Sequence, residues 1–151
     1  MRHAKHNHTL GVKKEHRLAL MANMASSLFT HDRIRTTVTK AKALRVYAEK
    51  IITLAKKASV AETPANKLHF RRLAIARLRN PSVVRELFDE KAVEFKDRLG
   101  GYTRIYKLGA RKGDAAEMAL IELVKGDDEG YTKRSDRHKA AAKKAGAKKA
   151  P

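Results

Sequence analysis

The stretch that decides the fold is RIRTTV (33–38), followed directly by TKAKALRVYAEKIITLAKKA (39–58). In the first segment β-branched side chains alternate with basic or polar ones, and this two-residue period predicts a strand. In the second segment apolar residues recur at helical spacing, and Thr39 is expected to cap the N-terminus of a long helix. The apolar stripe of this helix is Leu44, Ala48, Ile51 and Ala55. A strand that leads straight into an amphipathic helix indicates a domain that mixes both kinds of structure.

The segments on either side of this unit are predicted to be mainly helical. Residues 16–29 form one helix, with an apolar face made of Leu18, Met21, Ala25 and Leu28. The composition of SVAETPAN (59–66) is typical of a linker, and a further helix is expected over 66–79. The Asn80-Pro81 pair ends that helix and begins another over 81–93, with the asparagine as its cap and the proline in its first turn.

Two strands are predicted at the C-terminal end of the domain. The Gly100-Gly101 pair opens YTRIYKL (102–108), and a short loop at 109–114 leads to the buried strand MALIELV (118–124). Strands joined by so short a loop form an antiparallel hairpin, and the strand at 33–38 must join them because an isolated hairpin is only marginally stable. The predicted fold is therefore α+β, in the order helix, strand, three helices, two strands, with a small three-stranded mixed sheet packed with helices.

Charge divides the chain into three parts. The 151 residues carry a net charge of +19, from 35 basic and 16 acidic side chains. Residues 1–20 hold five basic side chains and one acidic one, and residues 131–151 hold eight and one. The first segment has too few apolar side chains to offset the entropy of ordering it alone. We therefore expect a basic N-terminal arm (1–15), a globular core (16–125), and a tail (126–151) that combines an acidic turn with a Lys/Ala-rich basic segment.

Composition argues against several classes of function. No run approaches the ~18 apolar residues of a membrane span, and the lack of cysteine removes disulfides and thiolate zinc sites. The histidines of the arm have no cysteine or placed carboxylate to complete a metal site. The acids cluster at 86–97 and 127–129, on a helix with its exit and in a turn, without a nucleophile–base pair for hydrolysis. We expect no enzymatic activity, no cofactor, no metal, no membrane contact and no small-molecule substrate.

The excess of basic side chains indicates a polyanionic partner, and their spread over the arm, helices, hairpin and tail favours a broad surface for nucleic acid. The hairpin gives the most specific signal. Tyr102 and Tyr106 are predicted to lie on one strand face with Arg104 between them, a pattern suited to stacking on unpaired bases or ribose. Arg111 and Lys112 in the loop would then meet phosphates. The alternative is that both tyrosines are half-buried packing residues with exposed hydroxyls.

Several separate motifs resemble one known family, that of bacterial large-subunit ribosomal protein seventeen. The matching segments span residues 1–124 and include MRH (1–3), HR (16–17), NMA (23–25), KAK (40–42), ITLAK (52–56), RRLAIARLR (71–79), GGYTRI (100–105) and IELV (121–124). The family order of helix, strand, three helices and two strands agrees with the order predicted above. Because the resemblance starts at Met1, we expect the arm to belong to the mature protein and not to be a transit peptide.

The resemblance implies a structural component of the large ribosomal subunit that acts in translation and is located in the cytoplasm. It implies binding to large-subunit ribosomal RNA near the nascent-peptide exit, beside ribosomal proteins numbered thirty-two and twenty-two. By position, the expected RNA contacts are Arg2, His3, Lys5, His16, Arg17, Lys40, Lys42, Arg71, Arg72, Arg77, Arg79, Tyr102, Arg104, Arg111 and Lys112. The alternative function is a free nucleic-acid-binding protein of the nucleoid or RNA-chaperone type.

The chain departs from the family pattern in its arm and first helix. Ala4, His8 and Val12 stand where the family commonly has arginine. A serine pair usually precedes His16, whereas this chain has Lys14-Glu15 there, so the first helix is expected to lack its usual cap, a loss of ~1 kcal/mol. The tail is expected to lie along RNA.

Overall fold

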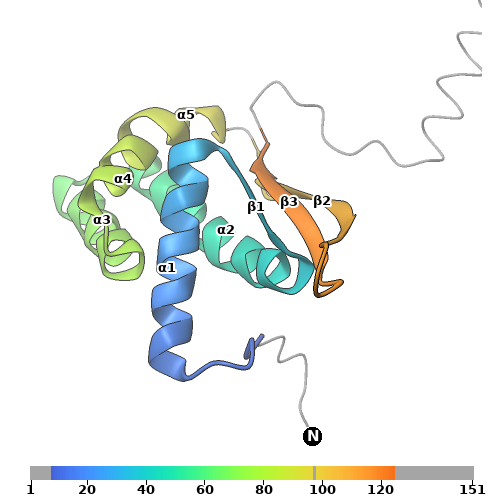
Figure 1. Ribbon diagram of the computed structural model, residues 1–151. Coiled ribbons are helices and arrows are strands. Elements are labelled where there is room, and N and C mark those ends of the chain that lie inside the picture. Colours follow the sequence, from blue (N-terminus) through green and yellow to red (C-terminus); the bar gives the residue numbers. More distant parts are fainter. Residues whose placement is uncertain (1–7, 97, 125–151) are drawn as a thin grey trace, which may run out of the picture.

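The computed structural model describes residues 8–96 and 98–124, and Figure 1 shows their arrangement. The elements are α1 (Lys14–His31), β1 (Arg33–Thr37), α2 (Val38–Val60), α3 (Pro64–Leu78), α4 (Pro81–Glu86), the π-helical turn η1 (Leu87–Lys91), α5 (Ala92–Glu94), β2 (Thr103–Ala110) and β3 (Glu117–Leu123). The predicted α+β class and the predicted order of elements are confirmed. The helix expected over 81–93 is present as three consecutive pieces, α4, η1 and α5.

The sheet has the strand order β1-β3-β2, and both neighbouring pairs are antiparallel. The expectation of a mixed sheet is therefore wrong. Strands β1 and β2 run parallel to each other, because each is antiparallel to β3. They are not neighbours, since β3 follows β2 in the hairpin and lies between β2 and β1. Ile121 of β3 pairs with Ile34 on one side and Ile105 on the other. The most apolar strand thus takes the central position, where it is covered best.

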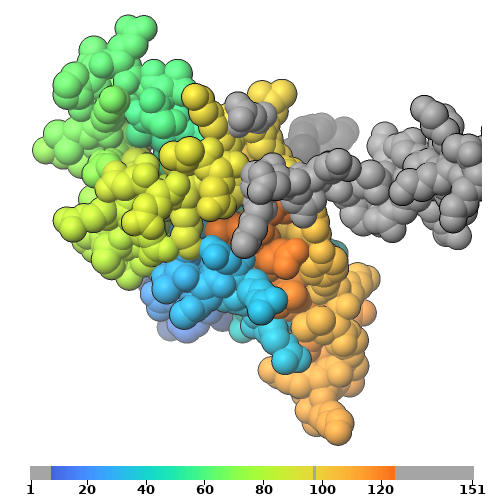
Figure 2. Space-filling model, turned by 90° about the horizontal axis from the view of Figure 1, so that it is seen from above, coloured from blue at the N-terminus to red at the C-terminus, as the bar shows by residue number. Residues whose placement is uncertain are grey.

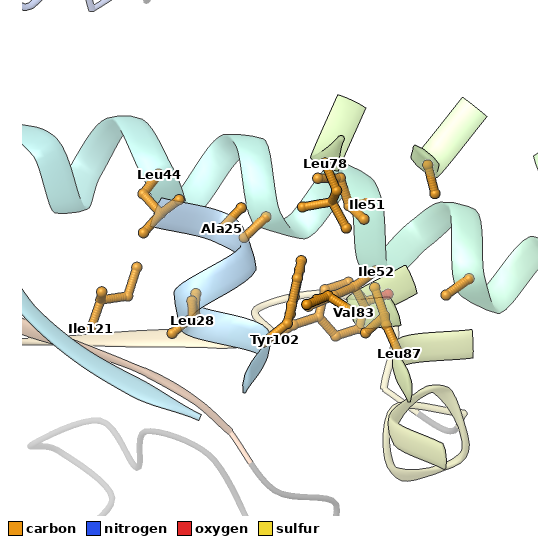
Figure 3. Packing of buried hydrophobic residues seen from close by; sticks show 14 of the residues in the cluster. Ala25, Leu28, Leu44, Ile51, Ile52, Leu78, Val83, Leu87, Tyr102 and Ile121 are labelled. Atoms are coloured by element: carbon orange, nitrogen blue, oxygen red, sulfur yellow. The ribbon is translucent and has the colours of Figure 1, made fainter. Parts of the chain in front are cut away.

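The core lies between α2 and one face of the sheet, and α1 packs across both (Figure 3). The predicted stripe of α2 is confirmed, since Leu44, Ala48 and Ile51 are completely buried and Ala55 nearly so. The predicted face of α1 is buried only from Met21 onward, because the first turns of this helix precede the part that contacts the core. Leu18 is 45% exposed and is not a core residue.

Helix ends follow the predicted chemistry at some positions and not at others. The Asn80 side chain accepts a hydrogen bond from Val83 N (3.4 Å), and Pro81 is in the first turn of α4, as predicted. Lys13 occupies the N-cap position of α1 and makes no side-chain cap, in agreement with the expected loss. The prediction of Thr39 as a cap is wrong, because β1 runs directly into α2 and the helix begins at Val38, with Thr37 at the N-cap position.

The predicted linker at 59–66 is shorter than expected. Helix α2 continues to Val60, and α3 begins at Pro64, so only three residues connect them. The Thr63 hydroxyl accepts a hydrogen bond from Asn66 N (3.4 Å), which caps α3 at a position that composition alone had assigned to a linker. The tight connection holds α3 against α2, where it shapes the surface described next.

Candidate nucleic-acid interface

A hollow surface crosses the first half of α2 and is bordered by α1, α3 and β2. Two hollows of about 340 Å³ each share Leu18, Tyr47 and Lys50. A third, of about 490 Å³, lies between α2 and β2 and shares His8 and Val46 with the first. We call these connected hollows the groove surface. Its cationic side chains are Arg17, Lys42, Arg45, Lys50, Arg77, Arg79 and Lys107.

Tyr47 connects two of the helices that line the groove surface, α2 and α3. Its hydroxyl donates a hydrogen bond to the carbonyl oxygen of Arg77 (2.7 Å), which ties α2 to the last turn of α3. Burial raises the pKa of the Tyr47 phenol, and the nearby Arg77 and Arg79 oppose this shift. The phenol therefore stays neutral and keeps its proton for this bond at physiological pH.

The end of α3 places two arginines beside the groove. Arg79 has a left-handed backbone conformation (φ 57°), and its N–H donates to the carbonyl oxygen of Ile75 (2.8 Å). This ending stops the helix at Leu78 and leaves Arg77 and Arg79 both lining the hollow that contains Lys50. Three cations from two helices therefore meet around one concave site.

The groove cations are free of acidic partners within the described residues. None of the seven forms an ion pair there, and Arg17 instead donates a hydrogen bond to the carbonyl oxygen of Thr9 (3.3 Å). Their charges are thus uncompensated and are carried on helices and a strand of fixed geometry. Such a surface attracts phosphates, and its backbone needs little rearrangement to meet them.

The structure divides the expected RNA contacts into several groups. Arg17, Lys42, Arg77 and Arg79 come together around the groove surface. Lys40 lies in the first turn of α2, while His16 and Arg72 are exposed on α1 and α3. Arg2, His3 and Lys5, with the tail, lie outside the described residues.

Other expected contacts have partners inside the protein. Arg71 pairs with Asp89, and its guanidinium carbon lies 5.7 Å from the centre of the Phe88 ring. Arg104 lies on β2, where its guanidinium is 3.8 Å from a carboxylate oxygen of Glu122. These arginines stabilise contacts between elements as well as adding positive charge.

The hairpin loop is closed by an ion pair. Arg111 Nε donates to Asp114 Oδ1 (3.0 Å), and its Nη2 lies 2.5 Å from Oδ2. This bidentate contact, helped by the N–H of Ala116, lowers the pKa of Asp114 to about 2. Lys112 is exposed within the same loop. Of the two cations predicted to meet phosphates here, Lys112 has no carboxylate partner within the described residues.

The expectation that Tyr102 stacks on a base is wrong. Tyr102 is only 4% exposed, and its ring makes an edge-to-face contact with Phe95 at 5.5 Å between centroids. The strand begins at Thr103, after Gly101 with φ +66°, so the alternation assumed over 102–108 does not include this residue. Tyr106 is 43% exposed. The two tyrosines therefore do not share one stacking face. Tyr102 is a packing residue, as the alternative expected, but it is more completely buried than that alternative assumed.

Sequence reasoning missed three groove cations, Arg45, Lys50 and Lys107. Arg45 and Lys50 are on the same helix as Lys42, but only packing against α1, α3 and β2 shows which side of α2 is concave. One signal available in the sequence was the apolar Val46 between Arg45 and Lys50, and the structure shows its side chain 45% exposed. An apolar residue among cations at helical spacing marks a surface suited to partly apolar ligands such as ribose and bases.

Fold and surface together define a small α+β protein whose cations line connected grooves. No helix in the described ranges is long and apolar enough to cross a membrane. The family described as "Ribosomal protein L17" matches residues 20–124. The chain belongs to this ribosomal protein family.

Several relatives are named "Large ribosomal subunit protein bL17". The protein of Opitutus terrae is 56% identical over 134 residues, which cover 88% of this chain and 78% of the relative. That of Methylacidiphilum infernorum is 50% identical over 126 residues, 83% of this chain and 90% of the relative. That of Pelobacter propionicus is 47% identical over 137 residues, 91% and 99% of the two chains.

Family membership confirms three expectations. The chain is a structural ribosomal protein that serves translation, it is not an enzyme, and its place on the ribosome puts it in the cytoplasm. The segments that resemble the family thus correctly identified it.

Proposed function

We propose that this protein is a structural constituent of the large ribosomal subunit that binds large-subunit ribosomal RNA through the groove surface and the arm. The observation that carries the proposal is the gathering of seven cations without acidic partners in the described residues around connected hollows. Each phosphate neutralised at this surface would release counterions and contribute to affinity.

The groove combines two kinds of side chain that RNA requires. Leu18 and Val46, each 45% exposed, give it apolar walls, and the cations stand at its borders. Phosphates would meet the cations, while ribose rings and base edges would cover the apolar side chains. Because the walls belong to packed helices, binding would need little rearrangement of the protein.

The arm joins this surface at a defined place. His8 lines both the hollow between α1 and α2 and the hollow between α2 and β2. Residues 1–7 are joined to the groove surface at His8, and we propose that Arg2, His3 and Lys5 extend the RNA contacts from there. Neighbourhood to the nascent-peptide exit and to ribosomal proteins thirty-two and twenty-two is part of the same proposal and rests on the family resemblance.

The test compares a groove variant with a charge-matched control. Arg77→Gln with Arg79→Gln removes two groove cations, and Lys57→Gln with Arg85→Gln removes two exposed cations outside the hollows. Binding to deproteinised large-subunit RNA is measured against salt concentration. The groove variant should bind at least tenfold more weakly and lose ~1 to 2 units of the salt slope, whereas the control should change little.

Sedimentation of cell lysates separates this function from its alternative. The wild-type protein should stay with large subunits after a high-salt wash. Release into the light fractions, together with equal binding to unrelated duplexes, would favour a free nucleic-acid-binding protein instead.

A further inference from the structure

The sheet has a second face, turned away from α2 and open in the described part of the chain. Residues on the inner face, such as Ala119 and Ile121, are completely buried against the helices. Residues that alternate with them point to the other side, where Arg33 and Arg35 are exposed and Tyr106 is 43% exposed. In Figure 2 the atoms of β1, β3 and β2 lie side by side at the surface.

Strand pairing places the side chains of this outer face in two rows. In the strand register, Arg33 and Arg104 both lie opposite Glu122 of the central strand, and Arg35 and Tyr106 both lie opposite Leu120. We call these six residues the outer sheet face. Its centre is formed by Leu120 and Glu122, with an arginine pair on one edge strand and an arginine–tyrosine pair on the other.

The Tyr106 ring is held in position on this face. Arg104 Nη1 donates to the Tyr106 hydroxyl (3.0 Å), and its guanidinium carbon lies 6.0 Å from the ring centre. Glu122 in turn holds Arg104 from the neighbouring strand at 3.8 Å. An aromatic ring that is exposed but fixed in orientation loses little conformational freedom when a flat ligand stacks on it.

On β1 the arginines are differently placed. Arg33 and Arg35 make no ion pair with any described residue. Two residues apart on one strand, they stand ~6.6 Å from each other along it, and they lie across Leu120 and Glu122 from the tyrosine. Their charges are thus available to an anionic ligand whose apolar part reaches Tyr106.

We propose that the outer sheet face binds an unpaired nucleotide of the large-subunit RNA, with its base on Tyr106 and Leu120 and its neighbouring phosphates on Arg33 and Arg35. The proposal rests on the proposed function and adds to it a second RNA site, on the other side of the sheet from the groove surface. Exposed aromatic side chains on an open sheet beside cations are a recurring means of binding single-stranded RNA.

Charge decides between the occupants of this face. It carries three arginines against one glutamate. A second copy of a chain with net charge +19 would bring like charge to it, as would the Lys/Ala-rich basic segment of the tail. The acidic turn of the tail (127–129) has the complementary charge but contains no flat apolar side chain for Tyr106. An RNA strand supplies both the negative charge and a flat apolar surface for Tyr106.

The experiment uses the full-length protein and deproteinised large-subunit RNA. Tyr106→Phe keeps the ring and loses only the bond from Arg104, whereas Tyr106→Leu keeps an apolar strand residue and loses the ring. Arg33→Gln with Arg35→Gln is compared with the charge-matched pair Lys57→Gln and Arg85→Gln. Thermal unfolding midpoints are measured for every variant, and ultraviolet cross-linking followed by trypsin digestion identifies the peptides attached to RNA.

We expect Tyr106→Phe, which keeps the ring but loses the bond that orients it, to bind only a few-fold more weakly than wild type. Tyr106→Leu should bind ~5- to 150-fold more weakly, the range for one lost stacked base. The Arg33/Arg35 variant should weaken binding and lower the salt slope more than its control. Cross-linked RNA should be found on the peptide that contains Tyr106 in wild type.

Two results would overturn the inference while leaving the proposed function intact. In one, Tyr106→Leu and the Arg33/Arg35 variant bind like wild type although the Arg77/Arg79 variant does not. In the other, the outer-face variants bind the RNA normally but fail to join large subunits, which would assign the face to a protein neighbour. Failure of wild-type protein itself to bind the RNA would instead refute the proposed function.

Discussion

The cations of this protein fall into two groups, according to whether each side chain has a carboxylate nearby. Arg71, Arg104 and Arg111 each lie near a carboxylate, whereas the groove cations and Arg33 and Arg35 have none among the described residues. A cation that already has a carboxylate partner must give up part of that interaction to bind a phosphate. A prediction from residue type alone therefore overestimates the number of strong RNA contacts. The ion pairs in the structure show which cations to discount.

The ion pair in the hairpin loop gives a prediction at this scale. Asp114 should titrate at a pKa of about 2, because Arg111 and the N–H of Ala116 stabilise its carboxylate. Since the pKa is lowered from 3.8, the pair stabilises the loop above pH 4 and is lost as the pH falls through 2. Arg111→Gln should move the pKa of Asp114 back toward 3.8, as measured by carboxyl NMR shifts against pH. An unchanged value in the variant would contradict the pairing.

At the scale of elements, a lysine joins the end of α1 to the π-helical turn. Lys91 donates to the carbonyl oxygen of Phe29 and to Asp32 Oδ1 (2.7 Å), and its ammonium lies 3.1 Å from Glu86 Oε1. The wider turn at Leu87–Lys91 aligns the side chain with α1, where cations stabilise the helix C-terminus. Neither the π-helical turn nor this junction was predicted, and the junction could not be read from a local segment because Lys91 lies about sixty positions from Phe29 and Asp32.

Lys91→Met should lower the free energy of unfolding by about 1–3 kcal/mol, because the Phe29 carbonyl loses its charged donor. Burial lowers the pKa of Lys91, but its contacts with Asp32 and Glu86 outweigh that effect and raise it above 10.5. The stabilisation is therefore complete below pH 10.5 and is lost as the pH rises through the raised value. Urea unfolding at neutral and alkaline pH should show the difference between wild type and variant shrinking at high pH. The exposed Lys96→Met is the control and should have a small effect at both.

At the scale of the whole molecule, the helices and the sheet present RNA with two surfaces of different character. The groove surface is concave and lined by three helices and by β2, and the outer sheet face is carried by the strands, with β3 between β1 and β2. Both depend on α2, which packs on the sheet with one side and borders the hollows with another. The core is thus the frame for both proposed sites.

Removing residues 2–13 should separate folding from binding. The deletion ends before α1 begins, and the buried residues start only at Met21, so the midpoint of thermal unfolding should fall by no more than a few degrees. Affinity for large-subunit RNA should fall at least tenfold, with a smaller salt slope, because Arg2, Lys5 and Lys13 are lost. Loss of cooperative unfolding in the truncated protein would contradict this division.

By itself the sequence determined the order of elements, the α+β class, the cap at Asn80, the distribution of charge and the family. These features depend on periodicity, capping and composition within short segments, or on motifs that can be matched one by one. Only the tertiary structure decided that β3 lies between β1 and β2, that Tyr102 is buried against Phe95 while Tyr106 is exposed, and which cations line the groove surface. Each of these depends on contacts between residues far apart in the chain, and burial and strand order are properties of the packed molecule rather than of any local segment.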